Sequence, residues 1–120
     1  MKSEPTSQYM FLVRGGSCSS GHSPEEMQAH MKEVYNWIDD LTKKGIFSAA
    51  QPLTQEGKIV SGPGLVSDGI AAESKEAVGG FFILNVASMD EAVRIAESSP
   101  MFGNGGRLEV RRIAALTACD

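Results

Sequence analysis

The sequence predicts an α+β sandwich in which two helices cover one face of an antiparallel sheet. Two helix-initiation signals lead to this class, because Ser23 and Ser88 are each followed three residues later by a glutamate. The third observation is that apolar segments of strand length flank both predicted helices. The predicted order is therefore strand, helix, strand, hairpin, strand, helix, strand.

Composition describes one ordinary globular domain. The 120 residues are 42% hydrophobic and 22% charged, as in folded rather than disordered chains. Residues 1–8 are expected to be a flexible polar leader without the apolar core of a signal peptide, and residues 9–120 a single domain. Lys and Arg number 11 against 15 Asp and Glu, which argues against nonspecific binding to nucleic acid or anionic membranes. We therefore expect a cytoplasmic protein, in which Cys18 and Cys119 are free thiols.

The first half of the chain is organised around one long amphipathic helix. An apolar strand is predicted at residues 9–14, and a small, polar loop follows it. Ser23 is the predicted N-cap, with Pro24 at the first helical position, and Gly45 is the predicted stop. Apolar residues between them recur at helical spacing and are expected to form the buried stripe: Met27, Met31, Val34, Ile38 and Leu41.

The middle of the chain predicts a hairpin-like excursion. Residues 46–53 form a predicted strand in which Pro52 indicates an edge position or a strand end. Two short extended pieces follow at 56–62 and 65–69, separated by turn residues. Residues 71–78 are mostly small or charged and predict a loop or a single helical turn.

The second half supplies the predicted centre of the sheet. Residues 81–87 are almost continuously apolar, so this strand is expected to be covered on both faces. Ser88 and Glu91 predict a second capping box, and the helix that they begin ends at Pro100. The last strand, at 108–113, has largely alternating faces.

This order of elements fits a ferredoxin-like, split βαβ sandwich with an added hairpin. Two helices cover only one face of such a sheet, yet apolar residues populate both faces of the strands at 9–14 and 81–87. Contiguous exposed apolar patches above a few hundred Å² are uncommon in monomers. A second copy of the sheet is the simplest cover, so we expect a homodimer packed sheet to sheet.

A signature-like stretch runs from Asp68 to Glu76 and reads Asp-Gly-Ile-Ala-Ala-Glu-Ser-Lys-Glu. It resembles the signature of the YCII-related family and, within that family, the DGPF branch, named for a D-G-P-F-x-E-x-K-E motif. Ile70 and Ala71 stand where the branch has proline and phenylalanine. Further matching features extend the resemblance from Tyr9 to Ile113; they are Tyr9-Met10, Arg14-Gly15-Gly16, Gly79-Gly80-Phe81, the Ser-x-Asp-Glu-Ala run at Ser88–Ala92, Pro100 and Glu109-Val110-Arg111.

The resemblance implies a ferredoxin-like α+β fold that dimerises into an α+β barrel. It implies no established biochemical role. Some relatives have been suggested to be enzymes because of a His–Asp pair in a cleft, and some members of the branch occur beside or fused to sigma factors.

His30 is the first candidate for acid–base chemistry. On a helix it lies roughly 40° from Val34, at the border of the apolar stripe. Imidazole exchanges protons near neutral pH, and a carboxylate such as that of Asp68 would orient it. The alternative is a boundary histidine that bonds a backbone carbonyl.

Three charged residues match the motif: Glu73, Lys75 and Glu76. In a functional interpretation, Lys75 holds an anionic or carbonyl group while a carboxylate moves a proton. The alternative is a solvated charged loop, or a set of ion pairs that attaches the loop to the partner subunit.

Arg14 and Arg111 are candidate ligand-binding residues if the first and last strands are neighbours. The fork of an arginine suits a carboxylate ligand. Pairing of these arginines with Glu109 or Asp68 within the protein is an equal alternative.

Two functions follow from these candidates. The first is a small-molecule binder or enzyme that transfers a proton without a cofactor, acting on a small polar or aromatic substrate in a cleft between the His30 helix and the Asp68–Glu76 loop. The second is a non-catalytic accessory module, such as a regulatory partner in transcription, that uses the homodimer as a platform. We expect no metal site, since Cys18, His22, His30 and Cys119 lack zinc-ligand spacing.

Overall fold

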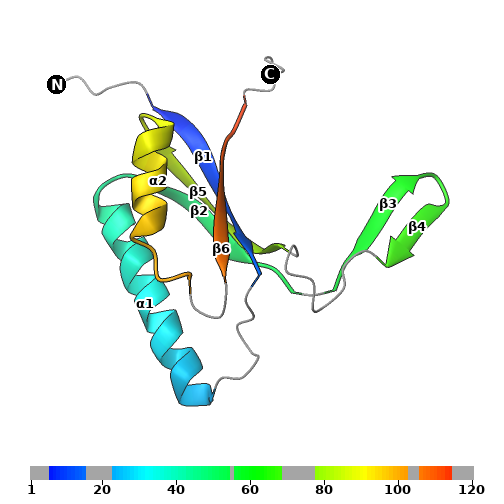
Figure 1. Ribbon diagram of the computed structural model, residues 1–120, viewed down its shortest axis with the longest axis horizontal. Helices are drawn as coiled ribbons and strands as arrows, with labels where there is room; N and C mark the ends of the chain where they lie inside the picture. The colour runs from blue at the N-terminus through cyan, green and yellow to red at the C-terminus, as the bar shows by residue number, and fades with distance from the viewer. Residues whose placement is uncertain (1–5, 16–22, 55, 69–77, 103–105, 115–120) are drawn as a thin grey trace.

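The structure is a computed structural model that describes residues 6–15, 23–54, 56–68, 78–102 and 106–114. In these ranges the chain forms two helices and six strands (Figure 1). They are β1 (Ser7–Arg14), α1 (Pro24–Lys43), β2 (Phe47–Pro52), β3 (Lys58–Gly62), β4 (Leu65–Asp68), β5 (Val78–Val86), α2 (Met89–Glu97) and β6 (Arg107–Arg112).

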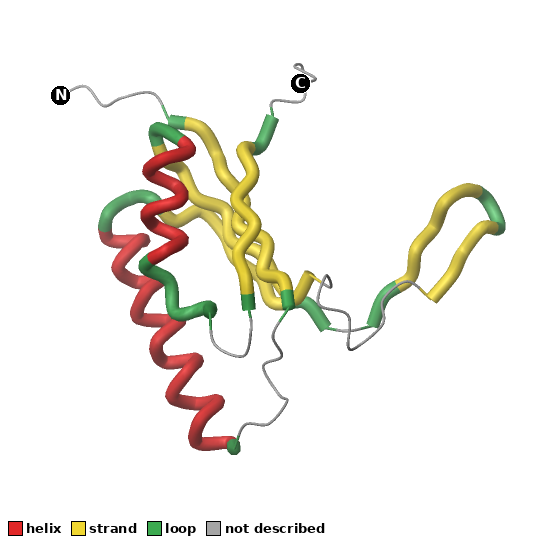
Figure 2. Tube along the Cα trace, viewed as in Figure 1, coloured by secondary structure: helices red, strands yellow, loops and turns green. Residues whose placement is uncertain are grey.

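Four of the strands form one antiparallel sheet with the order β2-β5-β1-β6. Strand β5 lies between β1 and β2, so β1, α1 and β2 form a split βαβ unit. Figure 2 shows both helices on the same side of this sheet. The predicted α+β sandwich is confirmed, including the edge position of β2, which carries Pro52. Strands β3 and β4 form the separate hairpin that the turn residues predict.

The two helices begin at the residues that capping chemistry predicts. At α1, the Glu26 amide donates to Ser23 Oγ (3.1 Å) and the Ser23 amide donates to Glu26 Oε1 (3.0 Å), which completes the predicted capping box. At α2, the Glu91 amide donates to Ser88 Oγ (3.1 Å), but the Glu91 carboxylate accepts from the amide of Ala87 instead of that of Ser88. The second predicted box is therefore displaced by one residue on its carboxylate side.

The core lies between the helices and one face of the sheet. It consists of the buried side chains Tyr9, Phe11, Val34, Leu41, Phe82, Leu84, Val86, Ala92 and Ala96. Trp37 joins the layers, because its ring meets that of Phe82 edge-on at 5.1 Å between centroids and its indole Nε1 donates to Ser98 Oγ (3.3 Å). One side chain of α1 thus contacts both the central strand and the end of α2.

The predicted buried stripe of α1 is wrong in its first half. Val34 and Leu41 are buried, whereas Met31 is 39% exposed and Met27 is only half-buried. Figure 1 shows the reason, since the N-terminal end of α1 extends past the strands and has no sheet beneath it. Helical periodicity identifies an apolar face, but it does not show how much of that face meets the sheet.

The two faces of the central strand are also covered unequally. Phe82, Leu84 and Val86 are buried against the helices, while Phe81 and Ile83 are only half-buried. Within one chain the expected cover on both faces is therefore incomplete. None of the helices that the structure describes is long and apolar enough to cross a membrane.

Candidate functional site

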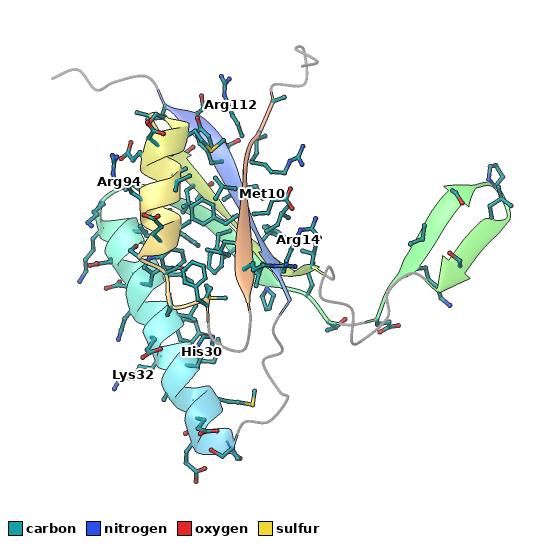
Figure 3. All side chains as sticks on the ribbon, in the orientation of Figure 1. Met10, Arg14, His30, Lys32, Arg94 and Arg112 are labelled. Carbon is teal, nitrogen blue, oxygen red and sulfur yellow. The ribbon has the colours of Figure 1, made fainter. Side chains whose placement is uncertain are left out.

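The candidate site lies on the face of the sheet that the helices leave open. Successive side chains of a strand point to opposite faces. Because Tyr9 and Phe11 are buried against the helices, Met10, Leu12 and Arg14 of β1 point to the open face. Figure 3 shows Met10 and Arg14 on this side, and His30 on the helix layer.

Strand register extends this face across the sheet. Met10 and Leu12 are opposite Ile83 and Phe81 of β5. All four side chains are half-buried and form an apolar centre over the two inner strands. We call this group, Met10, Leu12, Phe81 and Ile83, the open-face patch.

A charged cluster borders the open-face patch on the edge strand β6. Arg14 Nε donates to Glu109 Oε1 at 2.6 Å, and Arg111 Nη1 donates to Glu109 Oε2 at 3.1 Å. In the register, Glu109 is opposite Leu12 and Arg111 is opposite Met10, so both arise beside the patch. The two arginines bind the two oxygens of one carboxylate, and we call these three residues the Arg–Glu–Arg cluster.

The electrostatics of the cluster favour an ionised Glu109. Hydrogen bonds from the guanidinium groups of Arg14 and then Arg111 lower the pKa of the Glu109 carboxyl below its ordinary value. Two positive charges and one negative charge leave the cluster with a net charge of about +1 on a chain whose net charge is −4. It is therefore a local positive site beside an apolar surface.

The cluster bears on both alternatives that the sequence left open for Arg14 and Arg111, a ligand site and an ion pair within the protein. Strands β1 and β6 are neighbours, as the shared-pocket interpretation requires, and Glu109 pairs with both arginines. An internal ion pair and a ligand site are compatible here, since one guanidinium carries five N–H donors.

His30 lies on the N-terminal half of α1, where the helix extends past the sheet. Its side chain is half-buried, and the structure shows it no hydrogen-bond partner among the residues that it describes. A shallow apolar hollow of about 510 Å³ lies along the same helix, lined by Met27, Gln28, Met31, Lys32 and Tyr35. His30 is not part of this lining.

Asp68 ends β4, in the separate hairpin. This hairpin packs against none of the other helices and strands in the described ranges, and Figure 1 shows it on the opposite side of the sheet from α1. Asp68 and His30 are therefore not brought together within one chain. The predicted His–Asp dyad requires two chains.

The remaining candidates lie outside the described residues. Glu73, Lys75 and Glu76 fall in 69–77, together with Ile70 and Ala71, the positions that depart from the branch motif. Cys18, His22 and Cys119 are outside as well. In the part of the chain that is described, no three or more His, Cys, Asp or Glu residues gather as metal ligands would.

The sequence analysis did not predict one further feature, the exposure of apolar side chains on the β3–β4 hairpin. Ile59, Val60, Leu65 and Val66 are each more than half exposed. The signal was present in the sequence, because residues 59–67 contain no charged residue.

The split βαβ topology, with two helices on one face of a four-stranded antiparallel sheet, defines the class of an α+β sandwich domain. The family model of the YCII-related domain matches residues 7–117 of this chain. The chain therefore belongs to the YCII-related domain family. A comparison with curated proteins found no match.

Proposed function

We propose that this YCII-related chain acts as a homodimer that binds a small organic anion, a carboxylate on a polar or aromatic body, beside its open sheet face. The observation that carries the proposal is the Arg–Glu–Arg cluster, in which Arg14 and Arg111 converge on Glu109 next to an apolar surface. A guanidinium pair recognises a carboxylate through charge-assisted, directed hydrogen bonds. The adjacent apolar surface suits the body of such a ligand.

The dimer in this proposal forms through the open sheet faces. The open-face patch occupies the two inner strands, and the charged cluster stands on the edge strand β6. An apolar centre with a charged rim is the usual anatomy of a protein interface. Packing two such faces together leaves the cluster and the adjacent margin of the patch at the rim, where a ligand between the subunits has access from solvent.

Acid–base chemistry by His30 and Asp68 is a further part of the proposal, and it is possible only across the dimer. Helix α1 and strand β4 of one chain do not meet, so His30 of one protomer would face Asp68 of its partner. Such a dyad would exchange a proton without a cofactor. Because His30 lies on the helix layer, the dyad would act at a place separate from the Arg–Glu–Arg cluster.

The finer family assignment belongs to the proposal too. The Asp68–Glu76 stretch supports membership of the DGPF branch, and with it the alternative of a non-catalytic regulatory module. The two functions share the dimer and differ in the ligand.

Benzoate is a suitable probe, because it combines a carboxylate with an aromatic body. We expect it to shift the amide resonances of Leu12 and Phe81 in a saturable titration followed by ¹⁵N–¹H NMR. Arg111→Gln removes the guanidinium but keeps length and polarity, and should weaken binding about 10- to 100-fold, as the loss of a charge-assisted hydrogen bond does. Sedimentation equilibrium on the same sample reports the dimer.

Arg94→Gln is the matched control, since Arg94 is exposed on α2 in the helix layer. It should leave benzoate affinity unchanged. Equal weakening in both variants, or shifts that avoid the open face, would refute the ligand site. A dimer that binds neither benzoate nor aliphatic carboxylates would favour the regulatory module.

A further inference from the structure

The hairpin formed by β3 and β4 is a surface that the proposed ligand site does not use. We call residues Lys58–Asp68 the arm. Its apolar side chains are well exposed: Ile59 at 51%, Val60 at 67%, Leu65 at 61% and Val66 at 57%. Together they present apolar surface on the order of a few hundred Å², comparable to the largest patch on a typical monomer.

These side chains lie on both faces of the arm. Val60 is opposite Val66, so the two share one face. Ile59 is opposite Ser67, and Leu65 lies on the same face as Ser67 because they are two residues apart. Lys58 is opposite Asp68 at the base of the arm, and Ser67 is the polar residue opposite Ile59, so the exposed surface beyond the base is mainly apolar.

None of the other helices and strands that the structure describes covers the arm. An isolated two-stranded hairpin is at best marginally stable in water. An apolar hairpin held away from its own domain therefore needs another surface to pack against.

The direction of the arm indicates a second copy of this chain. Figure 1 shows it projecting on the side of the sheet opposite to α1 and α2, which is the side of the open face. A second protomer that docks on the open face would therefore contact the arm as well. By two-fold symmetry, the arm of the docked protomer reaches back toward the first.

The area of the open face gives an independent reason. Four strands about 4.8 Å apart, over about six residues of 3.3 Å each, present on the order of 400 Å². A stable interface buries about 800 Å² on each partner. The open sheet face alone falls short of this area, and the arm supplies a contribution of similar size.

The charge of the arm also favours a second copy of this chain as its partner. Residues 59–67 carry no charged side chain, so the arm approaches a second copy of net charge −4 without repulsion. A basic partner would be expected to meet several acidic residues on the arm, whereas Lys58–Asp68 contains one, Asp68, which lies opposite Lys58 at the base.

From these observations we propose that each protomer clasps its partner with the β3–β4 arm, which packs its apolar side chains against the other subunit and completes the dimer interface. This inference rests on the proposed dimer and goes beyond it, because it assigns to the arm a contact that sheet packing does not require.

The test changes the arm without touching the sheet. Val60→Lys combined with Val66→Lys places two charges on one face of the exposed arm, so the core remains intact. We expect the dimer dissociation constant, measured by sedimentation equilibrium, to rise about 100-fold, as for loss of an interface hot spot. Met89→Lys combined with Val93→Lys is the matched control: it places the same two charges at exposed apolar positions of α2, on the helix layer, and should leave the dissociation constant unchanged.

A photoreactive benzoylphenylalanine at position 59 reports the contact directly. We expect cross-links between ¹⁴N- and ¹⁵N-labelled chains in a mixed dimer. A dimer whose affinity the arm variant leaves unchanged, or cross-links confined to one chain, would overturn the arm and leave the proposed function standing. A wild-type monomer at micromolar concentration would overturn the arm and the proposed dimer together.

Discussion

Arg14 and Glu109 form a link between two neighbouring strands, with 2.6 Å between the guanidinium Nε and the carboxylate Oε1. In the register, Arg14 is opposite Arg107 and Glu109 is opposite Leu12, so the pair is diagonal across β1 and β6. Diagonal neighbours are within reach of long side chains on the same face. The link therefore holds the edge strand β6 to the inner strand β1, and it fixes a carboxylate beside the open-face patch.

Glu109→Gln should remove a pH-dependent part of the stability. The arginines lower the pKa of Glu109 below its ordinary value of 4.5 in the folded chain. Its contribution is therefore full above pH 4.5 and is lost as the pH falls through the lowered pKa. Urea unfolding between about pH 3 and pH 7 should give a shallower acid-side decline for the variant than for wild type.

Asp39→Asn is the control for this comparison. Asp39 pairs with Lys43 on the exposed surface of α1, at 3.1 Å, and such pairs contribute little. The Asp39→Asn variant should keep the wild-type dependence of the unfolding free energy on pH. An unchanged acid slope in Glu109→Gln would show that the cluster does not stabilise the fold.

Gly80→Ala should weaken the pairing of β2 with β5. A Cβ atom at Gly80 would lie 2.9 Å from the carbonyl oxygen of Gln51 and 3.3 Å from Pro52 Cα, both backbone atoms that cannot move alone. We expect a loss of about 1–3 kcal/mol in the free energy of unfolding. Gly79→Ala is the matched control, since the nearest atom to its Cβ is Val13 O at 4.0 Å. Chemical denaturation that ranks the two variants equally would contradict this account.

Local chemistry explains why much of the fold could be predicted. Ser23 and Glu26 define a helix start through contacts three residues apart, and the almost continuously apolar run at 81–86 is typical of a central strand. The extent of burial could not be predicted in this way. Whether Met31 meets the sheet depends on where α1 crosses it, which no local pattern contains.

The same distinction applies to the candidate site, where strand positions could be predicted from the sequence but contacts between distant residues could not. Arg14 and Arg111 could be selected from their strand positions, but their common partner depends on the register of β1 against β6. His30 and Asp68 could be paired only by assuming a cleft between their elements. The structure separates those elements within one chain, because the hairpin projects away from α1.

Leu41→Ala and Met31→Ala should differ in cost, although both residues belong to the same apolar stripe. Leu41 is 4% exposed and packs in the core, so its truncation should lower the free energy of unfolding by about 2–5 kcal/mol. Met31 is 39% exposed on the part of α1 that extends past the sheet, and its truncation should cost less than about 1 kcal/mol. Equal losses in thermal or chemical unfolding would indicate that the N-terminal half of α1 is covered in solution.

Phe81→Leu and Phe82→Leu should separate folding from assembly, because the two neighbours point to opposite faces of β5. Phe82 is buried and meets Trp37 edge-on, so its change loses an aromatic contact of about 0.5–1.5 kcal/mol together with core volume. Trp37 is the only tryptophan, and its fluorescence should therefore shift in Phe82→Leu and stay unchanged in Phe81→Leu.

Phe81 belongs to the open-face patch, where the proposed partner packs. Its change should raise the dimer dissociation constant by about tenfold or more, while unfolding of the monomer at high dilution is little affected. Phe82→Leu should do the reverse, since the side chain lies on the helix side and does not reach the partner. If both variants change monomer stability alike and neither changes dimer affinity, the open face is covered by something other than a second sheet.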